Sequence, residues 1–247
     1  APSPDACDIH TIEFQDGSEL LALNNLDDAV AHAPAKHSRP GMKWTSLFLD
    51  DAAYMTLDRA AATPGLTPLG HWAEVDVGIV TGRNAFFVLS SQQVAELQAS
   101  SHVVPIVGRT SALRTTRFGR TGFSEYSARH PSYILNLNGI PEHLIPPFLQ
   151  EYIRSGEREG VHLGYKCRVR KRWFDVPSIY IPDAFLYRQI HRYPLMAVNE
   201  AQATSTDTIH RVRLKAGVDN RLLATALFNS LTLAWTEVCG RSYGGGV

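Results

Sequence analysis

The sequence contains little cysteine and no long apolar run. Its three cysteines, Cys7, Cys167 and Cys239, lie far apart in a chain of 247 residues. Such a sparse, odd set argues against a disulfide framework and favours a reducing compartment, so we expect a cytoplasmic protein. No apolar stretch reaches the roughly 18 residues that a membrane span requires, and no charged-then-apolar leader opens the chain. We therefore expect neither a membrane span nor a signal peptide.

Catalytic and metal-binding signatures are also missing. The sequence has no GxSxG nucleophile motif, no GxxxxGK[ST] phosphate loop, and no HExxH or CxxC metal motif. The ten histidines are scattered, which is typical of surface or packing positions rather than of a metal site. No catalytic residue and no metal ligand is predicted.

Acidic and basic side chains are unevenly distributed. Residues 1–76 carry 12 acidic and 4 basic side chains, whereas residues 77–247 carry 12 acidic and 20 basic ones, 17 of them arginine. The net charge of the whole chain is zero, which argues against a histone-like protein. Asymmetry between two parts nevertheless indicates interaction of the basic part with nucleic acid. The acidic part would then face away from the nucleic acid or contact another protein.

The most basic stretch is Tyr165 to Phe174. It contains five cations framed by aromatic residues: Lys166, Arg168, Arg170, Lys171 and Arg172. The first three alternate with Cys167 and Val169, which predicts an extended strand with a row of cations on one face. That row fits a nucleic-acid backbone or another polyanion, because guanidinium groups bind phosphate through a planar fork. The competing interpretation is a solvated edge strand whose charges prevent aggregation.

Hydrophobic periodicity predicts an α+β fold with mixed, mostly antiparallel sheets, packed helices and a long C-terminal helix. Strands are expected over residues 9–14, 73–80, 86–89, 103–107, 132–137, 178–181, 185–187, 195–199 and 208–214. Helices are expected over residues 17–32, 44–62, 90–97, 141–155 and 220–239, with a polar loop over residues 108–131. The change of character near Leu69 divides the chain into a connector, residues 1–68, and a main domain, residues 69–247.

Several short motifs, taken together in order, resemble a known family. They are Lys43-Trp44-Thr45, Val77 to Asn84 (VGIVTGRN), Val107-Gly108-Arg109, Gly156 to Val161 (GEREGV) with Tyr165 to Arg168 (YKCR), and Ser242 to Gly246 (SYGGG). This order is similar to that of the C-terminal target-recognition half of gamma-type (TaqI-like) N6-adenine DNA methyltransferases of restriction-modification systems. The resemblance extends from about residue 43 to the C-terminus.

The resemblance implies a specificity domain that works with a separate catalytic domain. In the family, an N-terminal domain binds S-adenosylmethionine and transfers the methyl group, while the C-terminal domain grips double-stranded DNA and assists extrusion of the adenine. This chain lacks the glycine-rich cofactor loop. In Ile145-Pro146-Pro147-Phe148, an isoleucine stands where the family has Asn, Asp or Ser, and it cannot accept the hydrogen bond from the target amino group. We therefore expect no cofactor in this chain, no activity by itself, and an N-terminal methyltransferase domain as partner, with residues 1–42 as the link.

Candidate DNA-binding residues follow from charge and from the resemblance. The five cations between residues 166 and 172 are expected to bind phosphates. A second group lies in the expected polar loop and is better placed to read base edges: Arg109, Arg114, Arg117 and Arg120. Trp173 and Phe174 either stack on a base or pack at the end of the basic segment. Weaker candidates are Asn199, Arg211 and Tyr243; Asn199 could instead form a turn, and Tyr243 could lie in a flexible end.

An alternative hypothesis remains beside DNA recognition. The acidic first third of the chain would dock a protein partner, and the basic part would have lost the ability to bind DNA. RNA binding is disfavoured, because the sequence shows no RNA-module aromatic motif.

Overall fold

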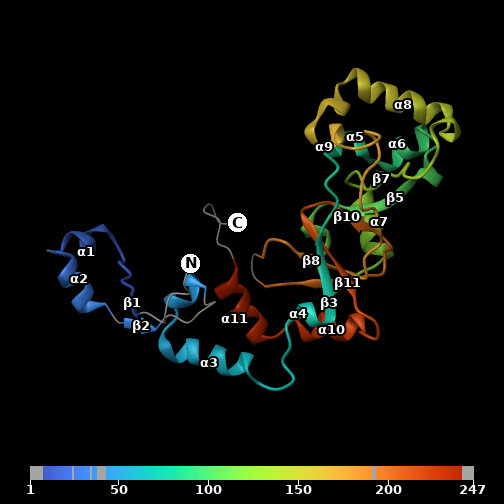
Figure 1. The fold of residues 1–247 in the computed structure, drawn as a ribbon. Helices are drawn as coiled ribbons and strands as arrows, with labels where there is room; N and C mark the ends of the chain where they lie inside the picture. Colours follow the sequence, from blue (N-terminus) through green and yellow to red (C-terminus); the bar gives the residue numbers. More distant parts are fainter. Residues whose placement is uncertain (1–7, 24, 34, 38–42, 191–192, 241–247) are drawn as a thin grey trace. The chain divides into compact units, whose positions relative to one another are not determined.

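The computed structural model describes residues 8–23, 25–33, 35–37, 43–190 and 193–240. The chain forms two compact units: Ala1–Thr67 with Asn229–Gly246, and Pro68–Phe228 (Figure 1). The last helix therefore belongs to the first unit, although sequence reasoning placed residues 69–247 in one domain. The role of residues 1–68 as a connector stays a prediction.

The first unit consists of a small hairpin and short helices. Strand β1 (Asp8–His10) pairs antiparallel with β2 (Ala35–His37). Between them, two helices replace the single helix expected over residues 17–32: α1 (Gly17–Leu21) and α2 (Leu26–His32). The chain breaks there because Asn25 caps α2, its side chain accepting a hydrogen bond from the Asp28 N–H at 2.8 Å. The remaining elements are η1 (Trp44–Phe48), α3 (Asp51–Ala61) and α11 (Ser230–Cys239).

The expected long C-terminal helix is two helices. Asp219 caps α10 (Asn220–Ala226), and its carboxylate accepts hydrogen bonds from the N–H groups of Arg221 and Leu222. Asn229 then caps α11 by accepting from the Thr232 N–H at 2.9 Å. A second capping side chain inside an apolar run starts a new helix and ends the old one. The prediction of one continuous helix is therefore wrong.

Two mixed sheets form the second unit. The five-stranded sheet has the order β3 (Ala73–Val77), β11 (Ile209–Leu214), β8 (Ala184–Tyr187), β9 (Met196–Asn199) and β6 (Arg117–Phe118). The four-stranded sheet has the order β10 (Thr204–Ser205), β5 (Val103–Val107), β7 (Tyr133–Leu135) and β4 (Val88–Leu89). Only β6–β9 and β10–β5 are parallel among these pairs. The α+β class with mostly antiparallel sheets is confirmed.

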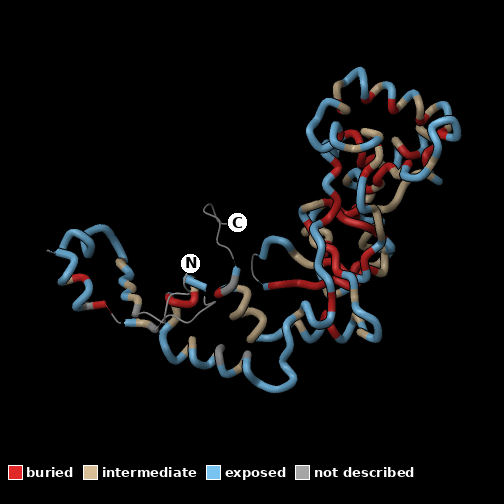
Figure 2. The backbone as a smooth tube through the Cα atoms, viewed as in Figure 1, coloured by how far each residue is buried: buried red, intermediate tan, exposed pale blue. Residues whose placement is uncertain are grey.

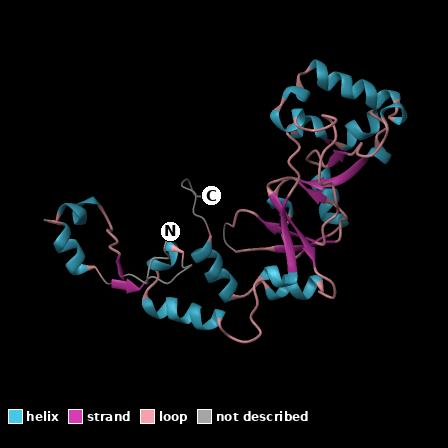
Figure 3. Cartoon of the chain, in the orientation of Figure 1, coloured by secondary structure: helices cyan, strands magenta, loops and turns pink. Residues whose placement is uncertain are grey.

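Helices surround these sheets in the second unit (Figure 3). Besides α10, they are α4 (Leu69–Trp72), α5 (Asn84–Phe87), α6 (Ser91–Glu96), α7 (Arg120–Ser127), α8 (Pro147–Arg158) and α9 (Tyr165–Arg168). Single 3-10 turns occur at Ser100–His102, Thr110–Ala112, Glu142–Leu144 and Val161–Leu163. The helix expected after Ser90 is confirmed: Ser90 and Gln93 form a reciprocal capping box.

Three local expectations fail in the second unit. Helix α5 occupies the first half of the strand expected over residues 86–89 and β4 the second half, and residues 178–181 form a turn and irregular backbone. Helix α7 and strand β6 lie in the expected polar loop. Short polar segments carry a weak periodic signal, so tertiary contacts decide their conformation.

Buried residues concentrate along the strands of the second unit (Figure 2). One apolar cluster joins the four-stranded sheet to α5 and α8, through residues such as Phe87 and Leu149. A second cluster surrounds Phe118 and Phe185, and a third lies between the five-stranded sheet and α10. No helix within the described ranges is long and apolar enough to cross a membrane.

Candidate functional site

The basic segment is a helical turn rather than a strand. Tyr165–Arg168 forms α9, in which the N–H groups of Cys167 and Arg168 both bond to the Gly164 carbonyl at 2.9 Å. Gly82, with φ +89°, lets this turn approach closely, because a Cβ there would lie 2.9 Å from the Lys166 Cβ. Alternate residues of a helix do not share a face. The expected single row of cations is therefore wrong.

Two of the five cations are held inside the fold. The Arg170 guanidinium donates to the carbonyls of Thr81, Val80 and Trp173 at 2.7, 3.2 and 3.3 Å. Burial lowers the pKa of Arg170. Arg172 donates twice to the Asp175 carboxylate at 2.7 Å, and also to the carbonyls of Ile140 and Leu137 at 2.5 and 3.0 Å. We therefore remove Arg170 and Arg172 from the expected phosphate ligands.

The aromatic residues after these cations pack in the core. Trp173 lies against the rings of Phe86 and Phe87, with centroids 5.3 and 6.1 Å away, and its indole N–H donates to Glu157 at 3.1 Å. Phe174 is buried. Of the two interpretations of this pair, packing agrees with the geometry.

Around α9 a different set of side chains reaches solvent. Lys166, Arg168 and Lys171 are exposed, as are two apolar side chains beside them, Tyr165 at 66% and Val169 at 63% of their full areas. The Lys166 ammonium lies 5.5 Å from the centre of the Tyr165 ring. The surface of α9 is therefore cationic with an apolar admixture.

Asn199 and Arg211 are also engaged internally. Asn199 is buried at the end of β9; its amide donates to the carbonyls of Pro182 and Ala203 at 2.8 and 2.7 Å, so it forms a turn. Arg211 is 2% exposed and donates to the carbonyls of Ser178 and Val77 at 2.6 and 3.0 Å. Both side chains have structural roles and we leave them out of the site. Tyr243 lies outside the described residues.

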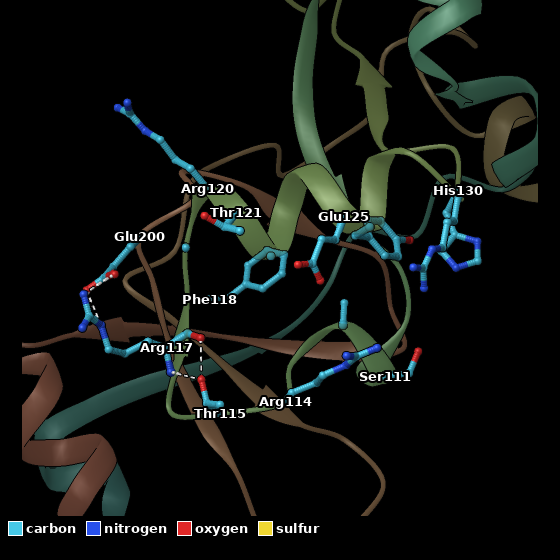
Figure 4. A pocket seen from close by; sticks show the side chains of 15 residues that line it. Ser111, Arg114, Thr115, Arg117, Phe118, Arg120, Thr121, Glu125, His130 and Glu200 are labelled. Atoms are coloured by element: carbon cyan, nitrogen blue, oxygen red, sulfur yellow. Dashed lines mark hydrogen bonds and ion pairs between the residues drawn. The ribbon is translucent and has the colours of Figure 1, made fainter.

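The arginine-rich segment surrounds a hollow of about 460 Å³ on the second unit (Figure 4). The turn at Thr110–Ala112, strand β6 and helix α7 line it. Phe118 anchors the strand in the second apolar cluster, so the residues on either side of it are held at the surface. The charged or titratable side chains in the wall are Arg114, Arg117, Arg120, Glu125, Tyr126, Arg129, His130 and Glu200.

Most guanidinium groups of this segment are free. Arg109, Arg114, Arg120 and Arg129 are exposed, and none of the four makes a side-chain hydrogen bond or ion pair with the part of the chain that the structure describes. Arg109 follows Gly108, whose N–H donates to the Tyr126 hydroxyl at 2.9 Å. Burial raises the pKa of Tyr126, against smaller opposing effects of this bond and of the Arg109 charge. The phenol therefore stays neutral and fixes the start of the segment.

Arg117 differs from its neighbours because it is paired. Its Nε and Nη2 donate to the two carboxylate oxygens of Glu200 at 3.0 and 2.8 Å, and Arg221 donates to the same carboxylate at 3.2 Å. The hydrogen bond from Arg117 lowers the pKa of Glu200. Figure 4 shows this pair on one side of the hollow and Arg114 on the other. The carboxylate is thus ionised and shared between two guanidinium groups.

Three residues of this arrangement are not among those expected from sequence. Arg129 belongs to the same arginine-rich stretch, so its spacing was a usable signal. Glu200 and Arg221 come from β9's end and from α10, and only the parallel pairing of β6 with β9 brings Glu200 to Arg117. No local pattern marks such a partner.

The described residues hold no metal-binding cluster, and the Pro146-Pro147 pair has a structural position. They contain no group of three or more His, Cys, Asp or Glu side chains able to hold a metal ion. Ile145 is 3% exposed, and Pro147 begins α8. The Pro146-Pro147 pair therefore starts a helix, and the buried isoleucine presents no polar group to a substrate.

Comparison with known proteins agrees with the resemblance seen in the sequence. Residues 41–247 match the family described as Type II methyltransferase M.Eco57I, C-terminal domain. The Type II methyltransferase M.AccI of Acinetobacter calcoaceticus is 21% identical over 253 residues, covering 96% of this chain and 45% of that protein. The chain thus spans less than half the length of this relative. Since the family match covers most of its residues, the chain belongs to the family of type II methyltransferase C-terminal domains typified by M.Eco57I.

Proposed function

We propose that the chain is the DNA-binding specificity domain of a site-specific adenine-N6 DNA methyltransferase. It would grip duplex DNA and assist extrusion of the target adenine, while a separate N-terminal domain transfers a methyl group from S-adenosylmethionine. The observation that carries the proposal is the hollow with free guanidinium groups at Arg114, Arg120 and Arg129. Clustered, unpaired arginines favour an anionic ligand with acceptor edges, and DNA offers both phosphates and bases.

The cations have two different tasks in this proposal. Lys166, Arg168 and Lys171 around α9 contact phosphates and hold the duplex in place. The arginines of the hollow read base edges, because a guanidinium matches the O6 and N7 acceptors of guanine in the major groove. Tyr165 replaces Trp173 as the aromatic side chain that is free to stack on a base.

Methyl transfer is assigned to another domain. The residues present do not fit a methyl-transfer site, because Ile145 is buried and non-polar. We therefore derive no catalytic step in this chain, and S-adenosylmethionine binding is proposed for the partner domain only. A calorimetric titration of this chain with S-adenosylmethionine should give no binding heat.

Fluorescence anisotropy with a labelled duplex tests DNA binding. The three exposed cations around α9 should give a slope of about −2.7 in a plot of log affinity against log salt, at about −0.9 for each phosphate. Absence of binding to any duplex at about 50 mM salt, a condition where phosphate contacts are strong, would contradict the proposal if circular dichroism shows an intact fold.

A second candidate is a protein-docking module without DNA binding. It is favoured by exposed leucines on the first unit, Leu21 at 86% and Leu26 at 77% of their full areas. Charge reversal at Arg168 and Lys171 distinguishes the two functions. Loss of duplex binding in the reversed variant supports the DNA-binding domain. The docking module is supported if the unaltered chain binds no duplex and if a stable protein partner is captured equally well by the unaltered chain and the reversed variant.

A further inference from the structure

An ion-paired group of three side chains lies at the edge of the hollow. One carboxylate, that of Glu200, accepts hydrogen bonds from two guanidinium groups, Arg117 and Arg221. Arg117 approaches both oxygens in the two-pronged geometry that guanidinium groups also use for phosphate. Glu200 therefore occupies the position on Arg117 that a DNA phosphate would take.

The position of this carboxylate is set by the sheet. The backbone N–H of Glu200 donates to the Phe118 carbonyl at 2.9 Å. Phe118 pairs with Asn199 in the parallel β6–β9 ladder, so Glu200 and Arg117 are held beside each other. The Glu200 side chain is 28% exposed, whereas the Arg117 and Arg221 side chains are 60% and 68% exposed. The two cations reach solvent, whereas the anion beside them is partly shielded.

We infer that Glu200 is an internal substitute for phosphate that withholds Arg117 and Arg221 from sequence-independent DNA binding. The free arginines of the hollow remain available to base edges, while the paired ones add no general attraction for the backbone. Fewer phosphate contacts improve the discrimination between the target site and other DNA, since sequence-independent binding arises almost entirely from phosphate contacts. The inference rests on the proposed function and concerns the specificity of the same site.

Removal of the carboxylate charge tests the inference. In Glu200→Gln both guanidinium groups are released, and each new phosphate contact adds about 0.9 to the steepness of the salt dependence. The slope for a labelled duplex of random sequence should therefore steepen by up to about 1.8, with a gain in affinity at low salt. Adding Arg117→Gln to this variant should remove about half of the change in slope.

Glu151 provides a matched control outside the hollow. On α8 its carboxylate also accepts from two guanidinium groups, Arg154 and Arg158, both at 2.8 Å. Glu151→Gln makes the same change in net charge. Its salt slope should lie closer to that of the unaltered chain than the slope of Glu200→Gln does. An equal response of both variants means that net charge alone acts, and it would overturn the inference.

The possible failures are distinguishable. If the unaltered chain binds the random duplex with a salt-dependent affinity but Glu200→Gln leaves the slope unchanged, the inference fails and the proposed function stands. If neither protein binds any duplex, although urea unfolding shows that both are folded, the proposed function fails and the inference falls with it.

Discussion

Arg172 and Arg168 lie four residues apart in the same basic segment, and the structure gives them opposite roles. Arg172 joins the Asp175 carboxylate to the carbonyls of Leu137 and Ile140, which lie before α8. Arg168 is exposed on α9. We predict that Arg172→Gln destabilises the fold without changing the salt dependence of DNA binding, and that Arg168→Gln does the reverse.

The size of the stability effect follows from the contacts. A hydrogen bond to a charged group contributes about 1.5 to 3 kcal/mol, and removal of one partner from a fully buried ion pair costs about 3 to 5 kcal/mol. The Arg172 and Asp175 side chains are 19% and 30% exposed, so water compensates part of the loss. We therefore expect Arg172→Gln to lower the free energy of unfolding by about 2 to 3 kcal/mol. For Arg168→Gln the change should stay within about 0.5 kcal/mol, as for most surface substitutions.

Two measurements test the opposite roles of Arg172 and Arg168. Urea unfolding gives the free energies, and anisotropy with a labelled duplex gives the salt slopes of the folded proteins. Arg168→Gln should make the slope shallower by about 0.9, the contribution of one phosphate contact. The reasoning is refuted if Arg172→Gln keeps full stability and makes the slope shallower instead, because the guanidinium would then contact phosphate rather than the carbonyls.

Three further predictions concern packing, stacking and pH. Gly156→Ala should destabilise the second unit, because the new Cβ would lie 2.6 Å from the Phe86 ring. Urea unfolding should show a loss of about 1 to 2 kcal/mol, which is the usual cost of overpacking less the helix preference of alanine. In the control variant Gly122→Ala the nearest contact of the new Cβ is 3.5 Å away, so the same assay should show a neutral or stabilising effect. Tyr165→Ala should weaken duplex binding by about 1 kcal/mol, the lower end for a stacked base, and should leave the salt slope unchanged. Tyr165→Phe keeps the ring and should bind normally. Equal anisotropy curves for the unaltered chain and both variants would exclude stacking. Burial lowers the pKa of His210 from 6.5, so the unfolded chain takes up its proton first and the free energy of unfolding should fall as the pH drops below 6.5. His210→Gln should flatten that part of the stability profile, and an unchanged profile would contradict this assignment.

Short-range features were predictable from sequence. The helix expected to begin at Ser90 and the strands expected over residues 73–80, 103–107 and 208–214 correspond to elements of the structure. These signals depend on neighbouring residues, and their physical cause is local: a side chain satisfies a nearby N–H, or alternate side chains face the core. Where two local signals competed, as at Asn229 inside an apolar run, the capping side chain ended the helix.

The family and the concentration of arginine were likewise determined by the sequence alone. Motif order predicted the family from about residue 43 to the C-terminus, and the family match covers residues 41–247. Charge counts showed that residues 77–247 carry 20 basic side chains against 12 acidic ones. Neither observation depends on how the chain is folded, because motif order and composition are properties of the linear sequence.

Only the tertiary structure decided which cations are available. Arg170 and Arg172 are occupied by carbonyls that the fold brings from distant segments, while Arg168 and Lys171 remain exposed. In the same way, parallel pairing of β6 with β9 places Glu200 on Arg117 and leaves Arg114 free. A guanidinium group has the same charge in every context; its partner is set by long-range contacts, which a pattern of neighbouring residues does not contain.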